Sequence, residues 1–417
     1  MAIITLNPQQ EIIKNQAVHW FLHESSQVFE IDGPAGTGKS VLIGQILKEL
    51  GLKSNEVAAM SYTGQASIVM RMRGFPSARS IHSTLYELVE IEDEDTRMAE
   101  TFGVKSKKKV FTLKKFIDPE IRLFFIDEGY MVPKDMVKDI LSFGIKVIVA
   151  GDAHQLPPVG GDPGFLTGYG VHHLTQLMRQ SESNPIVYIA NRAMNGEPIH
   201  NGSYTSKGYG HQNVLVINDD EFIPGMIGHA NCILCGTNRT REALNSQVRR
   251  LAGFEGTYPH HGERLVCRKN DWERSIDGIA LANGLSGTVI NNPDISPDGK
   301  TFTINFKPDL VNQIFWGVPV NYEYFTGDFE KKNAMKSSFN SKWLVGELFD
   351  YSYALTTHLA QGSEYPHCIY IEEFMRQQIQ NQLNYTAATR AVQTLIWVKK
   401  KRKVFYISGI NTNKTYQ

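Results

Sequence analysis

Residues 33–40 have the residue types and the spacing that hold phosphate groups. They read Gly-Pro-Ala-Gly-Thr-Gly-Lys-Ser and satisfy the pattern G-x-x-x-x-G-K-[ST] in full. Glycines in such a loop let backbone N–H groups converge on phosphate oxygens, and the next helix adds the partial positive charge of its N-terminus. The motif needs a strand before it and a helix after it. The apolar run 28–31 and the helical apolar spacing over 40–50 supply both, so the sequence predicts a nucleoside triphosphate site.

Two acidic residues at the end of a later apolar run suit hydrolysis at this loop. Residues 123–126 are apolar, and Asp127 and Glu128 follow them. With Lys39 on the β- and γ-phosphates and the Ser40 hydroxyl on Mg²⁺, Asp127 would hold the metal through water. Glu128 would orient and deprotonate the attacking water. The alternative is a strand that ends at a helix cap.

Three further polar residues have types that suit the same site. Gln155 follows the apolar run 147–150 and can sense the γ-phosphate from a strand tip. Gln10 lies in an amphipathic helix that Asn7 can cap, and its amide can read adenine through both polar atoms. Arg179 can stabilise transition-state charge as an arginine finger. Each has a plainer interpretation, as a loop glutamine, a solvent-facing helix glutamine and a surface arginine.

The composition indicates a folded protein with more than one domain. The chain has 417 residues, and its 43 Lys and Arg balance its 43 Asp and Glu. The formal net charge is therefore zero, and any surface for nucleic acid must be local. Four cysteines in a chain this long predict a reducing compartment, and Cys232 and Cys235 are interpreted as core thiols on opposite faces of a strand. Without a visible signal or membrane-length span, we expect a cytosolic protein.

The elements that position these residues form two α/β blocks. Strands alternate with helices from residue 28 onward, which predicts a parallel sheet with its ligand at the carboxyl ends of the strands. Residues 86–118 interrupt this pattern with acidic and basic runs, which predicts a small inserted β-hairpin. A second block begins near residue 213, with a helix over 238–251. Residues 262–344 are β-rich and predict a small inserted barrel, after which the second block resumes.

Five ordered segments carry a resemblance to superfamily 1 helicases. They are the phosphate loop 33–40, Ile-Asp-Glu at 126–128, Gly-Asp-Ala-His-Gln-Leu-Pro-Pro at 151–158, Thr-His-Leu-Ala-Gln-Gly-Ser-Glu at 357–364 and Tyr-Thr-Ala-Ala-Thr-Arg at 385–390. The chain is most similar to the RecD-like (1B) branch, and within it to the compact Dda-like helicases of T-even phages. Gly129 and Tyr130 depart from the family, which often has a small hydroxyl or apolar pair there.

The resemblance implies an α/β fold of two RecA-like domains, which are P-loop NTPase domains with parallel sheets flanked by helices. Residues 1–85 and 119–170 would form the first, with a hairpin insertion over 86–118. Residues 171–261 and 345–417 would form the second, with an SH3-like barrel insertion over 262–344.

The resemblance also implies ATP and Mg²⁺ between these domains. Lys39, Asp127, Glu128, Gln155, Arg179 and Arg390 would be catalytic, with both arginines coming from the second domain. Ser40 and Asp127 would hold the metal. The nucleotide would contact Gln10, Gly33, Pro34, Ala35, Gly36, Thr37, Gly38, Lys39, Ser40, Gln361, Gly362 and Glu364.

Single-stranded and forked DNA are the partners that the resemblance implies. Thr63, His82, Ser83, Thr357, His358 and Asn238 would face the strand, although N-capping explains some of these residues equally well. Phe111 is the candidate for the pin that splits the duplex, with packing under its own hairpin as the alternative. The family further implies a functional monomer, 5′→3′ movement, and contacts with single-stranded-DNA-binding protein and replisome components. A translocase that strips proteins from DNA and an RNA-directed helicase are the competing interpretations.

Overall fold

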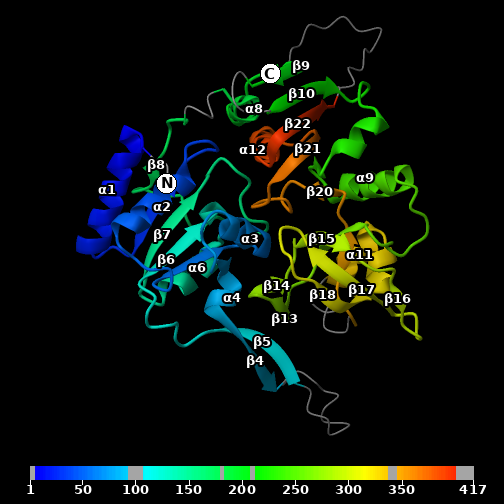
Figure 1. Ribbon diagram of the computed structural model, residues 1–417, viewed down its shortest axis with the longest axis horizontal. Coiled ribbons are helices and arrows are strands. Elements are labelled where there is room, and N and C mark those ends of the chain that lie inside the picture. Colours follow the sequence, from blue (N-terminus) through cyan, green and yellow to red (C-terminus); the bar gives the residue numbers. More distant parts are fainter. Residues whose placement is uncertain (1–4, 93–106, 179–182, 207–211, 337–344, 401–417) are drawn as a thin grey trace, which may run out of the picture.

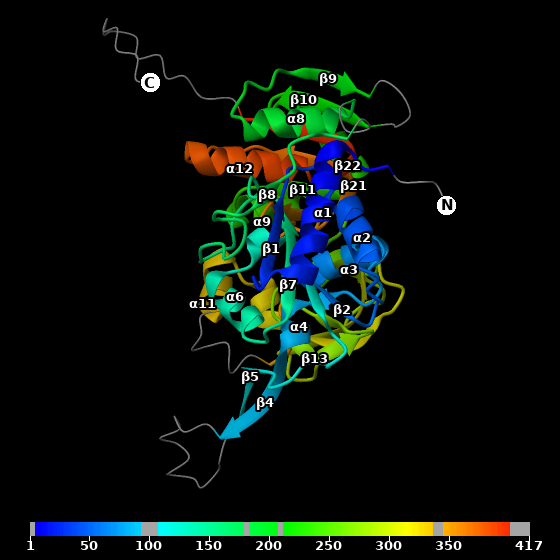
Figure 2. The same cartoon turned by 90° about the vertical axis from the view of Figure 1, so that its left-hand side faces the viewer.

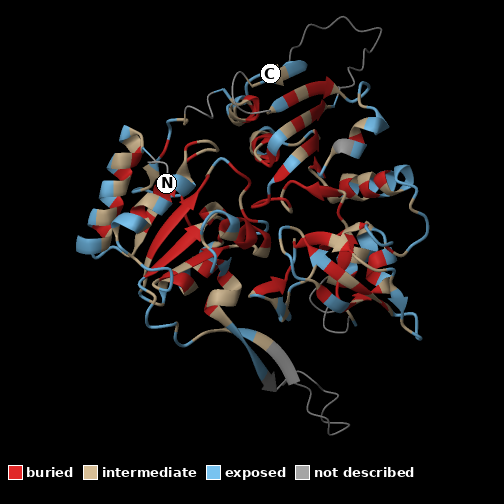
Figure 3. Cartoon of the chain, viewed as in Figure 1, coloured by how far each residue is buried: buried red, intermediate tan, exposed pale blue. Residues whose placement is uncertain are grey.

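The structure is a computed structural model that describes residues 5–92, 107–178, 183–206, 212–336 and 345–400. Two mainly parallel sheets with flanking helices lie side by side, and a third, antiparallel sheet lies beside the second (Figure 1). Buried residues are concentrated in these three sheets, whereas the hairpin that leaves the first sheet is mostly exposed (Figure 3). None of the helices among these residues combines the length and the apolar character needed to cross a membrane.

The first sheet contains the phosphate loop and the acidic pair. Its strand order is β3-β2-β6-β7-β1-β8 and all its pairs are parallel. The strands are β1 (Val28–Asp32), β2 (Val57–Ser61), β3 (Arg79–Ser80), β6 (Leu123–Asp127), β7 (Lys146–Gly151) and β8 (His172–His173). The helices are α1 (Pro8–His23), α2 (Lys39–Glu49), α3 (Gly64–Met72), α4 (Ile81–Leu85) and α6 (Lys134–Leu141), with a 3-10 turn η1 (Gly129–Met131). We call this sheet with its helices the first block.

Apolar residues of the central strands alternate between the two faces of this sheet. Phe125 and Ile148 pack into the core beneath α1 and α2, whereas Phe124 and Val149 pack into the core on the other face. Parallel strands that are covered on both faces therefore appear as continuous apolar runs, as predicted. One boundary was wrong: β8 pairs with β1 in parallel, so the first block extends past residue 170.

The predicted hairpin insertion is present. Strands β4 (Tyr86–Glu92) and β5 (Lys107–Leu113) pair in antiparallel register from Tyr86↔Leu113 to Glu92↔Lys107. The hairpin projects away from the first block in both views (Figures 1 and 2), and its turn lies outside the described residues. Phe111 is 40% exposed and lies within β5 opposite Leu88, so it is not at the tip.

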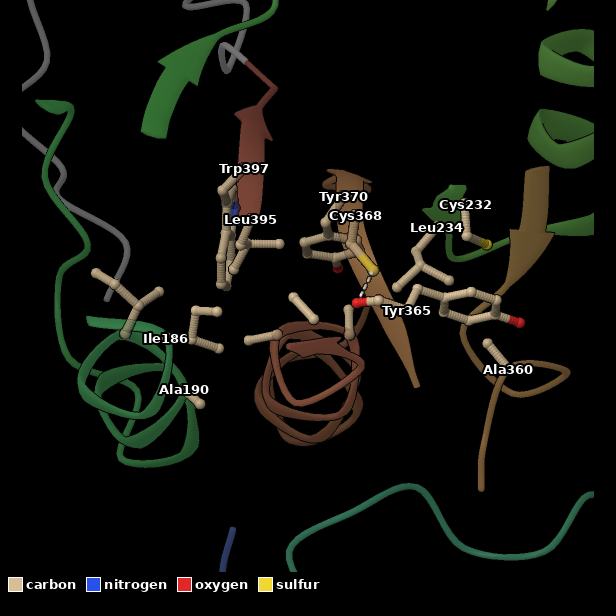
Figure 4. Close-up of a cluster of buried hydrophobic side chains, with 14 of the residues drawn as sticks. Ile186, Ala190, Cys232, Leu234, Ala360, Tyr365, Cys368, Tyr370, Leu395 and Trp397 are labelled. Carbon is tan, nitrogen blue, oxygen red and sulfur yellow. Dashed lines mark hydrogen bonds between the residues drawn. The ribbon is translucent and has the colours of Figure 1, made fainter. Parts of the chain in front are cut away.

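The second block is a sheet with the order β20-β11-β21-β22-β10-β9, parallel except for the edge strand β9. Its strands are β9 (Gly202–Thr205), β10 (Asn213–Asn218), β11 (Cys232–Cys235), β20 (Ala354–Thr356), β21 (Tyr365–Ile371) and β22 (Ala391–Lys399). Its helices are α8 (Pro185–Met194), α9 (Asn238–Leu251) and α12 (Gln377–Ala388), with a 3-10 turn η2 (Pro224–His229). Figure 4 shows Trp397, Leu395 and Tyr370 between the strands and helices α8 and α12. Cys232 and Cys235 are buried free thiols of β11.

A β-rich insertion follows α9. Its strands are β12 (Arg264–Cys267), β13 (Asp271–Ile276), β14 (Ile279–Leu281), β15 (Ser286–Val289), β16 (Asp294–Ile295), β17 (Thr301–Pro308), β18 (Phe315–Asn321) and β19 (Phe349–Tyr351), and its helices are α10 (Tyr322–Thr326) and α11 (Phe329–Lys336). The sheet order is β16-β17-β15-β12-β19, with β18 beside β17. A bridge between Val320 and Glu347 brings β18 to the residues that lead into β19, as a closing barrel requires. The strand at 349 was predicted in the second block. That was wrong, because it pairs with β12, and the second sheet resumes at β20.

Packing explains the glycine that departs from the family after the acidic pair. A Cβ on Gly129 would lie 2.1 Å from Val149 Cγ1, and Val149 is fully buried in β7. We predict that Gly129→Ala lowers the free energy of unfolding by about 1–3 kcal/mol, because the core cannot accept an added methyl group without moving. Chemical denaturation measures this loss. The control is Gly44→Ala in α2, where an added Cβ meets nothing within 4 Å, and which should stabilise or be neutral. Equal effects at both positions would contradict the packing argument.

Candidate nucleotide and nucleic-acid site

A cleft of about 820 Å³ lies between the two blocks. The first block lines it with Ala35, Gly36, Gly38, Lys39, Ser40, Val41, Gly44, Gln45, Arg73, Asp127, Glu128 and Gln155, and Met178 follows β8. The second block adds Glu364, Thr389 and Arg390. Residues far apart in the sequence thus meet in one cavity that combines backbone donors, acids and cations.

The phosphate loop has the backbone that its glycines allow. Gly36 and Gly38 have φ values of 86° and 79°, in the left-handed region that favours glycine. Gly38 precedes α2, whose N-terminus has no side-chain cap and opens on the cleft. Lys39 donates to the carbonyl oxygens of Gly33 and Pro34, the latter at 3.2 Å. The loop therefore presents a helix N-terminus without a side-chain cap and a cation, the two features that bind phosphate.

The acidic pair lies at the carboxyl end of β6, as predicted. Glu128 adopts a left-handed φ of 56°, uncommon for a side chain of its type, and its N–H donates to Asp127 Oδ1 at 3.0 Å. Burial raises the pKa of both carboxyl groups. The charge of Arg73 opposes this effect on the pKa of Asp127, and the charge of Arg390 opposes it on the pKa of Glu128. Ionisation of the pair therefore depends on cations from both blocks.

The residues at the head of α2 and the end of β6 fit Mg²⁺. Ser40 and Asp127 line the same cleft and offer a hydroxyl and a carboxylate, the hard oxygen ligands that Mg²⁺ selects. Among the described residues no group of three His, Cys, Asp or Glu could hold a metal. Phosphate oxygens and water would therefore have to complete the coordination, which is how Mg²⁺ is usually bound with nucleotides.

The loop that follows β7 is held by the second block. Leu156 N–H donates to Thr386 Oγ1 at 3.0 Å, and Gln361 Nε2 donates to Leu156 O at 2.7 Å. Arg390 Nη2 donates to Gln155 Oε1 at 3.2 Å. The structure thus brings together Gln155 and Arg390, which are 235 residues apart in the sequence. Gln361 was predicted to contact nucleotide, but it is buried and directed at Leu156, and it does not line the cleft.

A second contact between the blocks involves α3. Gly362 has a φ of 74°, and a Cβ there would lie 2.6 Å from Ala66 Cβ. Gly362 therefore serves close packing of the blocks, while Glu364 lines the cleft and forms an ion pair with Arg73. Sequence reasoning missed Arg73, because no motif includes the residue after α3 and only its contact with Glu364 reveals it.

The predicted adenine contact is occupied within the protein. Gln10 is fully buried, its Nε2 donates to Thr37 O at 3.0 Å, and its Oε1 accepts from Asn7 N–H at 3.0 Å. Asn7 and Gln10 form a capping box for α1, a pairing that uses the amide of Gln10. In this structure Gln10 braces the phosphate loop. Arg179, the other arginine predicted to act here, lies outside the described residues.

The residues predicted to face DNA differ in their accessibility. Thr63 caps α3 by accepting from Ala66 N–H, and the Ser83 hydroxyl donates to Ser80 O. His82, His358 and Asn238 are half-buried, and burial lowers the pKa of both histidines. For Thr357 the prediction was wrong. It is fully buried, and both its N–H and its hydroxyl donate to Cys235 O, because the chain continues the pairing of β20 with β11.

Comparisons with known proteins agree with this arrangement. Residues 5–212 match a family model described as an AAA domain, and residues 351–398 match the UvrD-like helicase C-terminal domain. The chain is 25% identical over 387 residues to an ATP-dependent RecD2 DNA helicase of Deinococcus radiodurans, covering 87% of this chain and 45% of that protein. It thus spans less than half the length of this curated relative.

Two solved structures share the fold. The Pif1 helicase of Candida albicans is 18% identical with a TM-score of 0.50, over 95% of this chain and 94% of that one. A structure of two coordinating Pif1 helicases at forked double-stranded DNA is 16% identical with a TM-score of 0.52, over 94% and 92%. The chain therefore combines a match to an AAA domain with a match to the UvrD-like helicase C-terminal domain. Its fold is the one seen in the Pif1 helicase structures, and its sequence is similar to that of the RecD2 DNA helicase.

The burial of Thr357 generates a test. We predict that Thr357→Val lowers the free energy of unfolding by about 1 kcal/mol, because Cys235 O loses a buried hydrogen bond. The dissociation constant for single-stranded DNA should stay within about twofold, since the side chain has no access to a ligand. Fluorescence anisotropy with a labelled oligonucleotide measures the affinity. A large loss of DNA affinity at unchanged stability would show that Thr357 does contact the strand.

Proposed function

We propose that this chain hydrolyses ATP to move along single-stranded DNA and to separate duplex DNA. The observation that carries the proposal is the cleft, in which the phosphate loop and the acidic pair of the first block meet Arg390 and Glu364 of the second. A nucleotide that contacts both blocks favours the closed arrangement, and hydrolysis removes that preference. Alternating closure and opening, with the grip on the strand changing between blocks, produces directed movement.

Each residue of the site has a chemical task in this proposal. Loop N–H groups and Lys39 hold the phosphates, while Ser40 and Asp127 would hold Mg²⁺, which neutralises phosphate charge when bound. Glu128 orients the attacking water and accepts its proton. Arg390 stabilises the charge that develops on the transferred phosphoryl group, and Gln155, hydrogen-bonded to Arg390, senses the γ-phosphate.

One ring contact near the hairpin supports a role for His82 in binding the strand. Half-buried His82 stacks on Tyr86 with their ring centroids 5.3 Å apart, at the junction between α4 and the hairpin. Aromatic rings of this kind can stack on bases without regard to sequence. Movement 5′→3′, a Dda-like mode of action in phage-type replication, recombination or repair, and action as a monomer belong to this proposal through the family resemblance alone. The D. radiodurans relative is named a DNA helicase, which favours DNA over RNA.

The two competing functions differ in measurable outputs. A translocase that only displaces proteins would clear a protein-blocked single strand but leave a forked duplex intact. An RNA-directed helicase would show greater ATPase stimulation by RNA than by DNA oligomers. Steady-state ATPase activity without and with each oligomer, followed by unwinding of duplexes with opposite tails, separates all three.

The two-block site predicts distinct effects at Lys39 and Arg390. Lys39→Ala should reduce kcat by about 100-fold or more, because the phosphates lose their cation. Arg390→Ala should reduce kcat by a similar factor with a smaller effect on ATP binding, since it acts on charge that develops in the transition state. ATPase kinetics and binding of a fluorescent ADP analogue measure the two quantities. Arg122→Ala, at an exposed arginine paired with Glu56, is the control. Normal hydrolysis by Arg390→Ala would mean that the two-block site is wrongly assigned.

The hairpin generates a prediction about strand separation. Phe111 lies within β5 and not at the tip, so the proposed pin is its exposed ring on the side of the hairpin. Phe111→Ala should reduce unwinding of a forked duplex by about tenfold while DNA-stimulated ATPase activity persists, because translocation along a single strand does not need this ring. Leu88→Ala, on the paired strand, tests whether any apolar loss from the hairpin has the same effect. If Phe111→Ala lost both activities equally, Phe111 would be a packing residue of the hairpin.

A further inference from the structure

A tyrosine of the second block is hydrogen-bonded to the phosphate loop. Tyr385 Oη accepts from Ala35 N–H at 2.8 Å and donates to Asp152 Oδ2. Ala35 belongs to the loop, Asp152 follows β7, and Tyr385 lies in α12. One hydroxyl group therefore joins three segments that come from both sides of the cleft.

The surroundings of this hydroxyl decide which hydrogen bond it donates and which it accepts. Tyr385 is fully buried, and burial together with the charge of Asp152 raises the pKa of its hydroxyl, so the proton stays on the tyrosine. Burial would raise the pKa of Asp152, but donors from His154 and Tyr385 and the charge of Lys39 hold it below its ordinary value. An ionised carboxylate can only accept and a backbone N–H can only donate, so the hydroxyl must donate to the first and accept from the second.

The helix that carries Tyr385 also leads to the arginine of the cleft. Thr386 binds the Leu156 N–H, and Arg390 follows the end of α12 and binds Gln155. Arg390 is further held by the carbonyl oxygens of Thr386 and Ser363, each at 3.2 Å. Residues 385–390 therefore connect the phosphate loop to Arg390, with Tyr385 at the end that contacts the loop.

We propose that Tyr385 is a positioning residue, which uses its hydroxyl to hold the phosphate loop in register with Arg390. This inference rests on the proposed ATP hydrolysis. Tyr385 does not itself touch the reacting atoms. Without the hydroxyl the loop and α12 can shift against each other, and a displacement of the cation by about 1 Å is enough to slow the chemical step by a large factor. Nucleotide affinity depends on the loop amides and Lys39, so it should be preserved when the Tyr385 hydroxyl is removed.

The test compares two buried tyrosines in the full-length chain. Tyr385→Phe removes the hydroxyl described above, and Tyr370→Phe removes an equally buried hydroxyl that donates to Asn384 Oδ1 at 2.7 Å, away from the loop. We expect Tyr385→Phe to lower DNA-stimulated kcat by about tenfold or more, with the Kd for a fluorescent ADP analogue within about threefold. Tyr370→Phe should stay within about twofold of wild type in both. A kcat within twofold for Tyr385→Phe, or equal losses in both variants, overturns the proposal.

A second variant approaches the same contact from the first block. Oδ1 of Asp152 already accepts from His154 N–H at 3.0 Å, so Asp152→Asn would direct its amide nitrogen at Tyr385 and give the hydroxyl no acceptor. This variant should also lose kcat with nucleotide affinity kept. The double variant should be at most about twofold slower than the slower single one, because the two groups act as a unit. If the two losses multiply instead, the proposal is wrong.

Failure of this inference can be distinguished from failure of the proposed function. If Tyr385→Phe does not fold, Asp152→Asn decides, and normal kcat in that variant overturns the inference. Wild type without any ATP hydrolysis overturns both the function and the inference. Wild type with DNA-stimulated hydrolysis that Tyr385→Phe retains overturns the inference alone.

Discussion

The peptide groups of Leu156 need partners that only the other block supplies. Leu156 is 1% exposed, and its N–H and C=O are satisfied by Thr386 and Gln361. A buried backbone group left unpaired costs about 1–3 kcal/mol, so the loop after β7 is stable in this conformation only while the second block is in contact. Gln155 precedes Leu156 and is thereby held against Arg390. Opening of the cleft would require water to replace these hydrogen bonds.

The β-rich insertion is anchored by a buried charge. Asp350 is 4% exposed and pairs with Arg241 of α9 at 2.9 Å, with Arg268 at 3.2 Å and with Lys332 of α11 at 2.8 Å. These cations hold the pKa of Asp350 well below its ordinary value despite burial. Because one carboxylate joins α9 to two parts of the insertion, removal of Asp350 would leave several buried cations uncompensated, which is strongly destabilising.

The insertion also reaches the first block through α3. Ile68 packs into the core of the insertion, and Arg71 Nη1 donates to Asp277 O at 2.9 Å. The same helix is capped by Thr63, packs against Gly362 and is followed by Arg73 in the cleft. Helix α3 therefore contacts the insertion and the second block at once, and Arg73 extends this connection to the nucleotide site.

Periodicity and motif spacing were sufficient to predict the helices and strands that depend on residues close together in the sequence. Residues 238–251 were predicted as a helix with the bounds that α9 has, and the apolar strands that precede the loop and the acidic pair were placed correctly, because local spacing encodes them. Short edge strands were not recognisable, since β8 has two residues and is defined by its partner β1. Strand β19 was assigned to the wrong sheet for the same reason, as pairing is a property of two segments.

The identity of the loop, the acids and the final arginine, and hence the class of chemistry, was determined by the sequence alone. Only the tertiary structure decided which polar groups remain available for ligands. Gln10 and Thr357 have suitable chemistry, but their hydrogen bonds are satisfied inside the protein, whereas Arg73 lies in the cleft without any motif. Tyr385 reads in the sequence as one more residue of a motif, yet its hydroxyl joins two blocks. The reason is that hydrogen bonds are directional and short-ranged, so a side chain's role depends on what the fold places within about 3 Å of it.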